Sequence, residues 1–446
     1  MKKLLILFLL TLSVSANAQI NKKLIHFMLA NSGTSSDPYY YADLPDEPNY
    51  GANPVANLTT SVGASVSQTA LNTASGSSGT KHATIVSPFL NRLQTLQLVG
   101  TNTAKYYWKP TTGRTLIGGG TSITSGQKIV NQTGGTISDY HVFYGFDVRG
   151  ADNPATSGII GMAWTARVTT GTRVEFINNS ISNVSSAGVQ INDGVTANFY
   201  DSLTFKFNRI IGDPGVHEGT EGEYLGSTNP TTYSLINNSI LEDGFIAYRG
   251  WDGAQRNSHA NMQMDHYTVF DVGNLNAVGQ RNLLQAQNVK GTISNCIFWN
   301  APDMFVIAAT GLNLVNCYFY STGAAGLWQD LDLDAGYGAS SLRDHTPNTV
   351  TNCHFYTDAA VGYAIDFREG NTNTTFTNCT TNKAALYLDN RVDKVTYTLS
   401  QTGTTTGAAI PSAPTFNSVD PDNAEAGLVQ EIYWRLTGAG YRNRLN

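Results

Sequence analysis

The chain has 446 residues, of which 41% are hydrophobic and 13% are charged, and glycine occupies 43 positions. This length allows a substantial core, while the abundance of Gly, Ser, Thr and Asn argues against a mainly helical protein and indicates a β-protein with many tight turns. The formal net charge of −6, without a basic stripe, argues against a nucleic-acid partner.

The N-terminus has the three parts of a secretory signal peptide. Lys2 and Lys3 precede the apolar run 4–12, and Ala16-Asn17-Ala18 supplies a cleavage site of small residues. The apolar run is too short to span a bilayer, and no later segment approaches the roughly 20 apolar residues of a transmembrane helix. We expect residues 1–18 to be removed and the mature protein, without an integral membrane segment, to be secreted, periplasmic or held at the cell surface.

Three further regions follow the signal peptide. Residues 19–80 show little periodicity and are rich in small polar residues, which predicts an N-terminal linker or cap. Residues 81–412 are predicted to form the solenoid described below. Residues 413–446 are predicted to form a C-terminal cap with a short helix, since apolar residues from Ala424 to Leu436 follow helical spacing before Gly438.

From about residue 170 the chain repeats a short motif in which Asn precedes a polar residue or Cys and then Ile or Phe. Its copies are Asn178–Ile181, Phe207–Ile210, Asn237–Ile240, Asn295–Phe298, Asn316–Phe319 and Asn352–Phe355. Their last residues are 29, 30, 58, 21 and 36 apart, and the longest interval holds a degenerate copy, His266–Val269. Short strands with a variable period predict an all-β fold, a right-handed parallel β-helix, with Asn bonding along the axis and Ile or Phe filling the core.

A second strand follows each copy by roughly ten residues, with apolar and polar residues in alternation. Alternation places one set of side chains in the core and the other on a solvent face. The outward column is predicted to contain Gln190, Gln255, Gln285, Gln329 and Asp366. The region 82–170 is predicted to form earlier, less regular coils.

All four cysteines fall at the same position of the repeat, at residues 296, 317, 353 and 379. In an exported protein an even number of cysteines favours disulfides. Their common register favours instead a column of buried thiols, because parallel side chains on stacked strands aim poorly at one another. The two states stay open at this point, and no Cys/His spacing resembles a zinc site.

The segment 217–256 departs from the repeat and concentrates ionisable and aromatic residues. Glu221 and Glu223 stand close together in a charge-poor chain, and Tyr224 follows them. Stacking of the coils would bring this strand between those of Gln190 and Gln255. The neighbouring coil would then add Arg249, Trp251 and Asp252 to an acidic patch flanked by aromatic residues.

The segments Glu221–Gly226 and Gly250–Gln255 resemble paired motifs of secreted bacterial right-handed β-helix proteins in the pectate-lyase-like superfamily. The resemblance covers about residues 130 to 400 and is more specific for fold than for activity. It implies a protein that binds or cleaves acidic or neutral polysaccharide, in some members with calcium, although other members are tailspikes or adhesins.

The catalytic candidates are therefore Glu221, Glu223, Asp252 and Arg249, and the substrate-binding candidates are Tyr224, Trp251, Gln190, Gln255, Gln285 and Gln329. Glycoside hydrolysis needs two carboxylates, whereas a lyase needs a base, and no lysine is expected on the outward face of the repeated strands. Asp330, Asp332 and Asp334 alternate along one segment and are a candidate Ca²⁺ site. His217, His266 and His354 have no evident triad partner.

Two functions remain open. The first is a polysaccharide lyase or glycoside hydrolase that works along the strand face. The second is a non-catalytic adhesin or a tailspike-like receptor-binding protein, which the amide-rich column favours because amides bind sugar hydroxyls without chemistry. The carboxylates at Glu221, Glu223 and Asp252 favour the enzyme, and the signal peptide disfavours a phage spike.

Overall fold

The computed structural model describes the side chains of residues 126–132, 140–150, 158–164, 172–191, 200–212, 238–247, 261–269, 290–299, 311–321, 346–367, 373–390, 397–412 and 439–440, with the backbone of further strands from residue 56 to residue 329. All of these lie in one compact unit, Tyr50–Tyr441. The predicted signal peptide and the predicted capping helix lie outside the described residues. No helix in the described part of the chain is long and apolar enough to cross a membrane.

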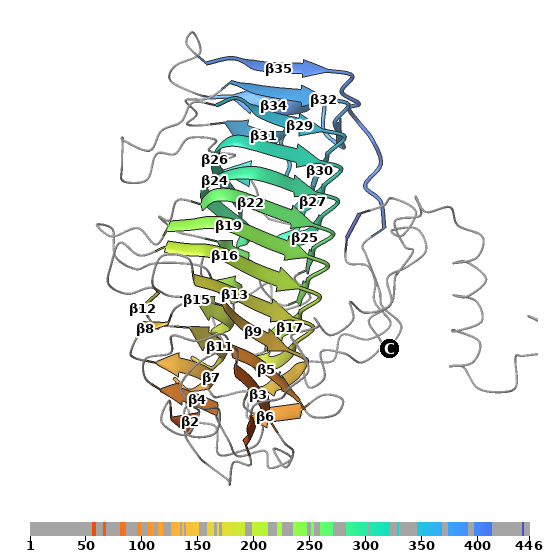
Figure 1. Cartoon of the computed structure of the whole chain (residues 1–446). Helices are drawn as coiled ribbons and strands as arrows, with labels where there is room; N and C mark the ends of the chain where they lie inside the picture. The colour runs from red at the N-terminus through yellow and green to blue at the C-terminus, as the bar shows by residue number, and fades with distance from the viewer. Residues whose placement is uncertain are drawn as a thin grey trace, which may run out of the picture. The chain divides into compact units, whose positions relative to one another are not determined.

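The strands form three parallel ladders, which we call A, B and C and which the chain visits in the order A, C, B from residue 106 to residue 321 (Figure 1). Ladder A contains β1 (Ala56–Leu58), β3 (Lys81–Ile85), β5 (Tyr106–Pro110), β9 (Tyr140–Tyr144), β13 (Thr172–Ile177), β16 (Phe199–Lys206), β19 (Leu235–Glu242), β22 (His259–Asp265), the second halves of β24 (Asn282–Ser294) and β26 (Met304–Val315), β29 (Asn348–Thr351), β32 (Thr374–Thr377) and β35 (Leu399–Thr402).

Ladder B contains β2 (Val66–Ser67), β4 (Leu96–Val99), β7 (Lys128–Thr133), β11 (Ile160–Trp164), β15 (Ala187–Ile191), β18 (Glu221–Tyr224), β21 (Trp251–Gly253) and the first halves of β24 and β26. In later coils its place in chain order is taken by a three-stranded sheet of β28 (Trp328–Gln329), β31 (Tyr363–Phe367) and β34 (Ala385–Asp389).

Ladder C contains β6 (Thr115–Gly118), β10 (Phe146–Arg149), β14 (Ser180–Val184), β17 (Arg209–Gly212), β20 (Phe245–Ala247), β23 (Thr268–Phe270), β25 (Ile297–Ala301), β27 (Tyr318–Ser321), β30 (His354–Thr357) and β33 (Thr380–Thr381). A separate pair is formed by β8 (Thr136–Ile137) and β12 (Arg167–Val168). Every pairing between these strands is parallel, as expected of a parallel β-solenoid. Pairing of β1 with β3 and of β2 with β4 carries the ladders into the region 19–80.

The corner between ladders A and C has one conformation throughout. Its first residue has a positive φ in each described coil from Gly145 to Gly403, as at Asn178 (55°), Asp243 (52°) and His266 (53°), and also at Phe207 (62°). Asn, Asp and His tolerate this left-handed region better than most residues, which explains the recurring Asn. The Asn column also bonds along the axis, since Asn316 Nδ2 donates to Asn295 Oδ1 at 2.9 Å, as predicted.

The second corner residue points into the core, and its chemistry changes along the solenoid. In the early coils it is Asn179 or Asn208, both buried, and Asn179 Nδ2 donates to Asn208 Oδ1 at 3.1 Å. In the late coils it is Cys296, Cys317, Cys353 or Cys379, each completely buried and free. The buried thiols are therefore not joined in disulfides.

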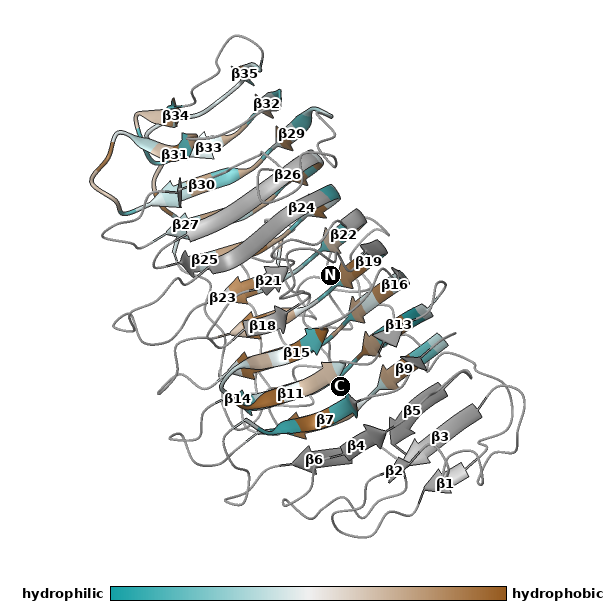
Figure 2. Ribbon diagram, turned by 90° about the vertical axis from the view of Figure 1, so that its left-hand side faces the viewer, coloured by the Kyte–Doolittle hydropathy of each residue, from teal (hydrophilic) through white to brown (hydrophobic). Residues whose placement is uncertain are grey.

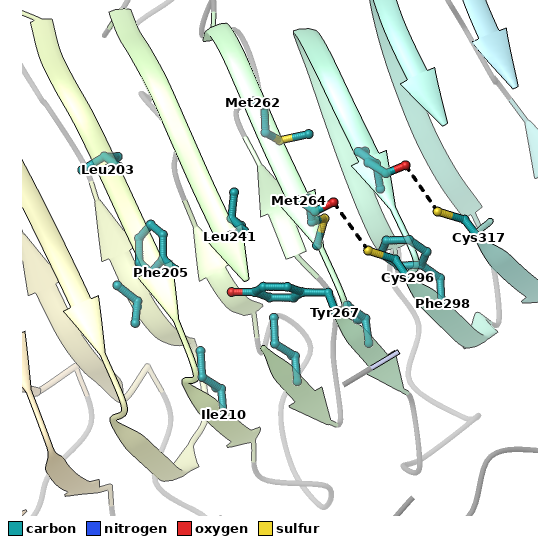
Figure 3. Close-up of a cluster of buried hydrophobic side chains, with 14 of the residues drawn as sticks. Leu203, Phe205, Ile210, Leu241, Met262, Met264, Tyr267, Cys296, Phe298 and Cys317 are labelled. Atoms are coloured by element: carbon teal, nitrogen blue, oxygen red, sulfur yellow. Dashed lines mark hydrogen bonds between the residues drawn. The ribbon is translucent and has the colours of Figure 1, made fainter. Parts of the chain in front are cut away.

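Gly244 and Tyr267 separate the amide part of this column from the thiol part. A Cβ on Gly244 would lie 2.1 Å from the Tyr267 ring, so the ring occupies the space that a side chain at residue 244 would need. Figure 3 shows the ring reaching from its own coil toward the coil of Leu241. Tyr267 is fully buried and thus fills the core of two coils.

The thiols donate to backbone carbonyls of the core rather than to solvent. Cys296 Sγ contacts Ser294 O at 3.0 Å and Met264 O at 3.9 Å, and Cys317 Sγ contacts Ile293 O at 3.5 Å (Figure 3). Burial raises the pKa of the Cys379 thiol, which disfavours the reactive thiolate.

The next columns of ladders A and C form the apolar core. Along β13 the side chains alternate, with Val174 and Phe176 buried and Arg173 exposed, and Figure 2 shows the corresponding alternation of hydropathy. Rings stack from coil to coil, with centroids 5.1 Å apart both for Phe298 and Phe319 and for Phe319 and Phe355. Like residues thus pack on like residues along the axis.

One copy of the predicted repeat is wrong. Ile240 lies inside β19 and pairs with Thr204 and Gln263, whereas the true corner of that coil is Asp243-Gly244 and the residue in register with Ile210 is Ile246. The coil lengths there are therefore 36 and 23 residues rather than 30 and 29. The degenerate copy at His266–Val269 is confirmed, because Val269 pairs with Phe298.

Replacing Gly244 with Ala is expected to destabilise the protein by about 1–3 kcal/mol, because the new methyl group overpacks against the Tyr267 ring. Chemical denaturation of both proteins measures the difference. Gly362→Ala is the control, since nothing lies within 4 Å of a Cβ there. Equal stability of the two variants would contradict the packing described.

Native protein is expected to leave all four thiols unreacted with an aromatic disulfide reagent, and denatured protein to expose them all, because each is completely buried. Absorbance of the released thiolate follows the reaction. A Ser400→Cys variant, exposed on β35, supplies the reactive control. Fewer than four thiols in the unreduced, denatured protein would reveal a disulfide.

Candidate functional site

Ladder B brings four of the predicted site positions into one backbone column. Gln190 of β15 pairs with Tyr224 of β18, Tyr224 with Asp252 of β21, and Asp252 with Gln285 of β24. Gln190 is half-buried, whereas its neighbours Val189 and Ile191 are buried in the core. Tyr224, Asp252 and Gln285 therefore share the register position of Gln190, whose side chain faces outward.

The two glutamates occupy different register positions from this column. Glu223 pairs with Val189, a core residue, and Glu221 pairs with Ala187. The predicted neighbourhood of β18 and β21 is present at the level of the backbone. The side chains of Glu221, Glu223, Tyr224, Trp251 and Asp252, and all of Arg249, lie outside the described residues, so their roles remain predictions.

One member of the predicted outward column is corrected, and another lies outside the described residues. The latter is Gln255, and the residue of β21 that pairs with Gln285 is Asp252. Gln329 does pair with Asp366, as the alternation indicated. Asp366 is only 2% exposed, however, and accepts a hydrogen bond from Asn390 Nδ2 at 2.7 Å, so it is not a surface residue.

The predicted calcium site at Asp330, Asp332 and Asp334 lies outside the described residues. Within the described ranges no group of three His, Cys, Asp or Glu side chains is arranged to hold a metal ion. Calcium binding therefore remains a prediction from the sequence.

A second polar site, which we call the corner cluster, lies where ladder A meets the corner. It consists of Lys206, Glu242, Asp265, His266, Ser294 and Asn295. Lys206, Glu242, Asp265 and Ser294 come from successive coils in register, and His266 and Asn295 are the corner residues of two of them. Lys206 Nζ lies 2.9 Å from Glu242 Oε2, and both side chains are about two-thirds buried.

Asp265 is the centre of the corner cluster. Its Oδ2 lies 2.7 Å from His266 Nδ1, and its Oδ1 accepts hydrogen bonds from Ser294 Oγ at 2.7 Å and Asn295 Nδ2 at 2.8 Å. Burial raises the pKa of Asp265, but the hydrogen bonds and the charge of His266 outweigh burial and lower the pKa to about 2. Asp265 is therefore ionised at neutral pH and holds the imidazole in one orientation.

The Asp265–His266 pair is not a nucleophilic triad. Ser294 donates to the carboxylate rather than to the imidazole, and His266 Nε2 is buried without a hydrogen-bond partner in the described part of the chain. A buried Nε2 that no substrate reaches cannot serve as a general base. The arrangement therefore anchors the corner, and its exposed part is Asp265, whose side chain is 38% exposed.

Sequence reasoning missed the corner cluster. It left His266 without a partner, although the adjacent Asp265 supplies one, and it placed no lysine on the outward faces, although Lys206 is one-third exposed on ladder A. The signal present in the sequence was the acid–histidine pair at the degenerate copy of the repeat. His354 is different: it stacks on Tyr318 at 4.1 Å, and burial lowers its pKa to about 4, so it is neutral at pH 7.

Comparison with known proteins found no family model, no curated protein and no solved structure that matches this chain.

An Asp265→Asn variant is expected to be less stable than the native protein above about pH 4 and to approach it as the pH falls toward 2. The folded carboxyl has a pKa near 2 against an ordinary 3.8, so its contribution is present above the ordinary pKa and is lost as it protonates. Partial exposure limits the effect to about 1 kcal/mol.

Thermal denaturation of both proteins between pH 2 and pH 7 measures this difference. Asp201→Asn is the control: it breaks the Arg173–Asp201 ion pair, which is exposed and should contribute little at any pH. A pH-independent difference for Asp265→Asn would contradict the pKa assigned to that carboxyl.

Proposed function

We propose that the chain is an exported right-handed β-helix protein of the pectate-lyase-like kind that binds polysaccharide along ladder B. The observation that carries this proposal is the backbone column of Gln190, Tyr224, Asp252 and Gln285 on four successive strands. Successive positions lie about 4.8 Å apart. A column of amides, a phenol ring and a carboxylate at this interval suits an extended chain of hydroxyl-bearing rings.

The lengths of the connections between the strands around ladder B also support polysaccharide binding on this ladder. From β13 to β33 two residues separate each ladder A strand from the ladder C strand that follows it, whereas the connections that enter and leave ladder B vary widely. Seven residues separate β15 from β16, ten separate β18 from β19, and eleven separate β23 from β24. Variable connections are where proteins place binding residues, and they border ladder B on both sides.

A second candidate function is cleavage of the bound polysaccharide. Glu221 and Glu223 on β18 and Asp252 on β21 belong to hydrogen-bonded neighbouring strands. Because the two glutamates share the register of Ala187 and Val189 while Asp252 shares that of Tyr224, a carboxylate pair about 5–9.5 Å apart, as glycoside hydrolysis requires, needs β18 to depart from strict alternation. Arg249, two residues before β21, is the basic candidate for a lyase, and bound calcium would neutralise a uronate.

Binding of the purified protein to a panel of uronate-containing and neutral glycans tests the proposal. Tyr224→Ala and Gln190→Ala are each expected to weaken binding about tenfold, equivalent to about 1.4 kcal/mol. Gln263→Ala, at an exposed position of ladder A, is the matched control and should bind as the native protein does. Absence of binding to every glycan, or binding indifferent to both ladder B variants, would reject the proposal.

Product analysis in the same assay separates the two candidate functions. Turnover that Glu223→Gln or Asp252→Asn abolishes would assign an enzyme. Binding without turnover in the native protein would assign an adhesin or a receptor-binding protein.

A further inference from the structure

The late coils of ladder A carry a two-column array of short uncharged side chains, polar at every position except Val315, which we call the threonine array. Its positions are Asn313 and Val315 of β26, Thr349 and Thr351 of β29, Thr375 and Thr377 of β32, and Ser400 and Thr402 of β35. Pairing is in register throughout, from Asn313 to Thr349, Thr375 and Ser400, and from Val315 to Thr351, Thr377 and Thr402. The array thus repeats in two directions.

The array lies open on the surface. Thr349, Thr375, Ser400 and Thr402 are exposed, and the remaining members are half-buried. Between the columns, Leu314, Val350 and Phe376 point into the core and are buried. Each of β26, β29 and β32 therefore presents two short side chains outward around one core residue, whereas Gln401, the corresponding residue of β35, is exposed.

Charge divides ladder A into two parts. The earlier coils carry the Arg173–Asp201 and Lys206–Glu242 ion pairs and the Asp265 carboxylate. None of the eight array positions carries a charged or an aromatic side chain. An ionic ligand finds no counter-charge at these positions, and a sugar ring finds no aromatic face.

Spacing in the array is set by the backbone. Neighbouring coils lie about 4.8 Å apart, and alternate residues along a strand lie about 6.6 Å apart. Thr has few χ1 rotamers, and hydrogen bonds restrict the side chains further: Thr349 Oγ1 donates to Asn313 Oδ1 at 2.6 Å, and Ser400 Oγ to Thr375 Oγ1 at 3.2 Å. Little side-chain entropy is lost when such a surface meets a rigid partner.

We propose that the threonine array binds the surface of an ice crystal. Ice offers an uncharged, rigid lattice of hydrogen-bonding oxygens that repeats in two dimensions, as the array does. Each threonine pairs a methyl group with a hydroxyl group, so that it can both exclude liquid water and hydrogen-bond to the lattice. Single contacts of this kind are weak, and binding depends on their number and regularity.

Ice recrystallisation and thermal hysteresis, measured with the full-length protein, test this proposal. The native protein is expected to slow recrystallisation and to depress the freezing point below the melting point. Thr375→Lys and Thr349→Lys, each at an exposed position, are expected to abolish both effects without altering the melting temperature of the protein. Leu388→Lys, at a 38% exposed position of β34, is the matched control and should retain them.

Three results would overturn the proposal. One is a native protein without effect on ice growth, and another is equal loss in Leu388→Lys and the array variants. The third is binding to insoluble cellulose or chitin that the array variants lose while ice growth is unaffected, which would assign the surface to a crystalline polysaccharide. Binding to soluble glycans through ladder B is measured separately and does not bear on these outcomes.

Discussion

One backbone hydrogen bond recurs at the corner between ladders A and C. In each coil from Gly145 to Asn378 the N–H of the first corner residue donates to a carbonyl at the end of the ladder A strand in the next coil, at 2.8–3.2 Å. Each of these donors has a positive φ, a conformation that Gly, Asn and Asp tolerate well and that Phe207 also adopts. Because each bond ties a corner to the next coil, it sets the register of the ladders on both sides of the corner.

This register determines the chemistry of the core. The second corner residue always lies in the interior, where a polar side chain is acceptable only with partners. Asn179 satisfies this condition by accepting from Phe146 N at 3.0 Å and donating to Phe143 O at 3.2 Å. The cysteines need fewer hydrogen-bond partners than the asparagines, since a thiol is a weak donor and behaves as a small apolar group. At Gly244 the column changes from buried amides to buried thiols, and the Tyr267 ring fills the space that a side chain at residue 244 would occupy.

The sequence reveals the corner wherever Asn occupies it, and this was enough to predict the parallel solenoid and the shared column of the cysteines. It failed at the coil of Asp243, because the left-handed region accepts Asp as well as Asn, while Asn237-Asn238-Ser239-Ile240 imitates the motif within β19. The column position on β21 was hard to assign for a related reason: β21 has only three residues, too few for alternation to show that Asp252 is the residue that pairs with Gln285. The corner cluster was missed because its members come from coils 23 to 36 residues apart.

A fixed corner also decides where the molecule can vary. Coils range from 21 to 36 residues, yet from β13 to β33 two residues separate ladder A from ladder C in each coil, so the variation falls on the connections next to ladder B. Insertions there cost little free energy, because they leave the ladder hydrogen bonds intact. Ladder A, beside the invariant corner, instead keeps a regular surface on which threonines repeat from coil to coil. An irregular ligand is thus best accommodated on ladder B, and a periodic one on ladder A.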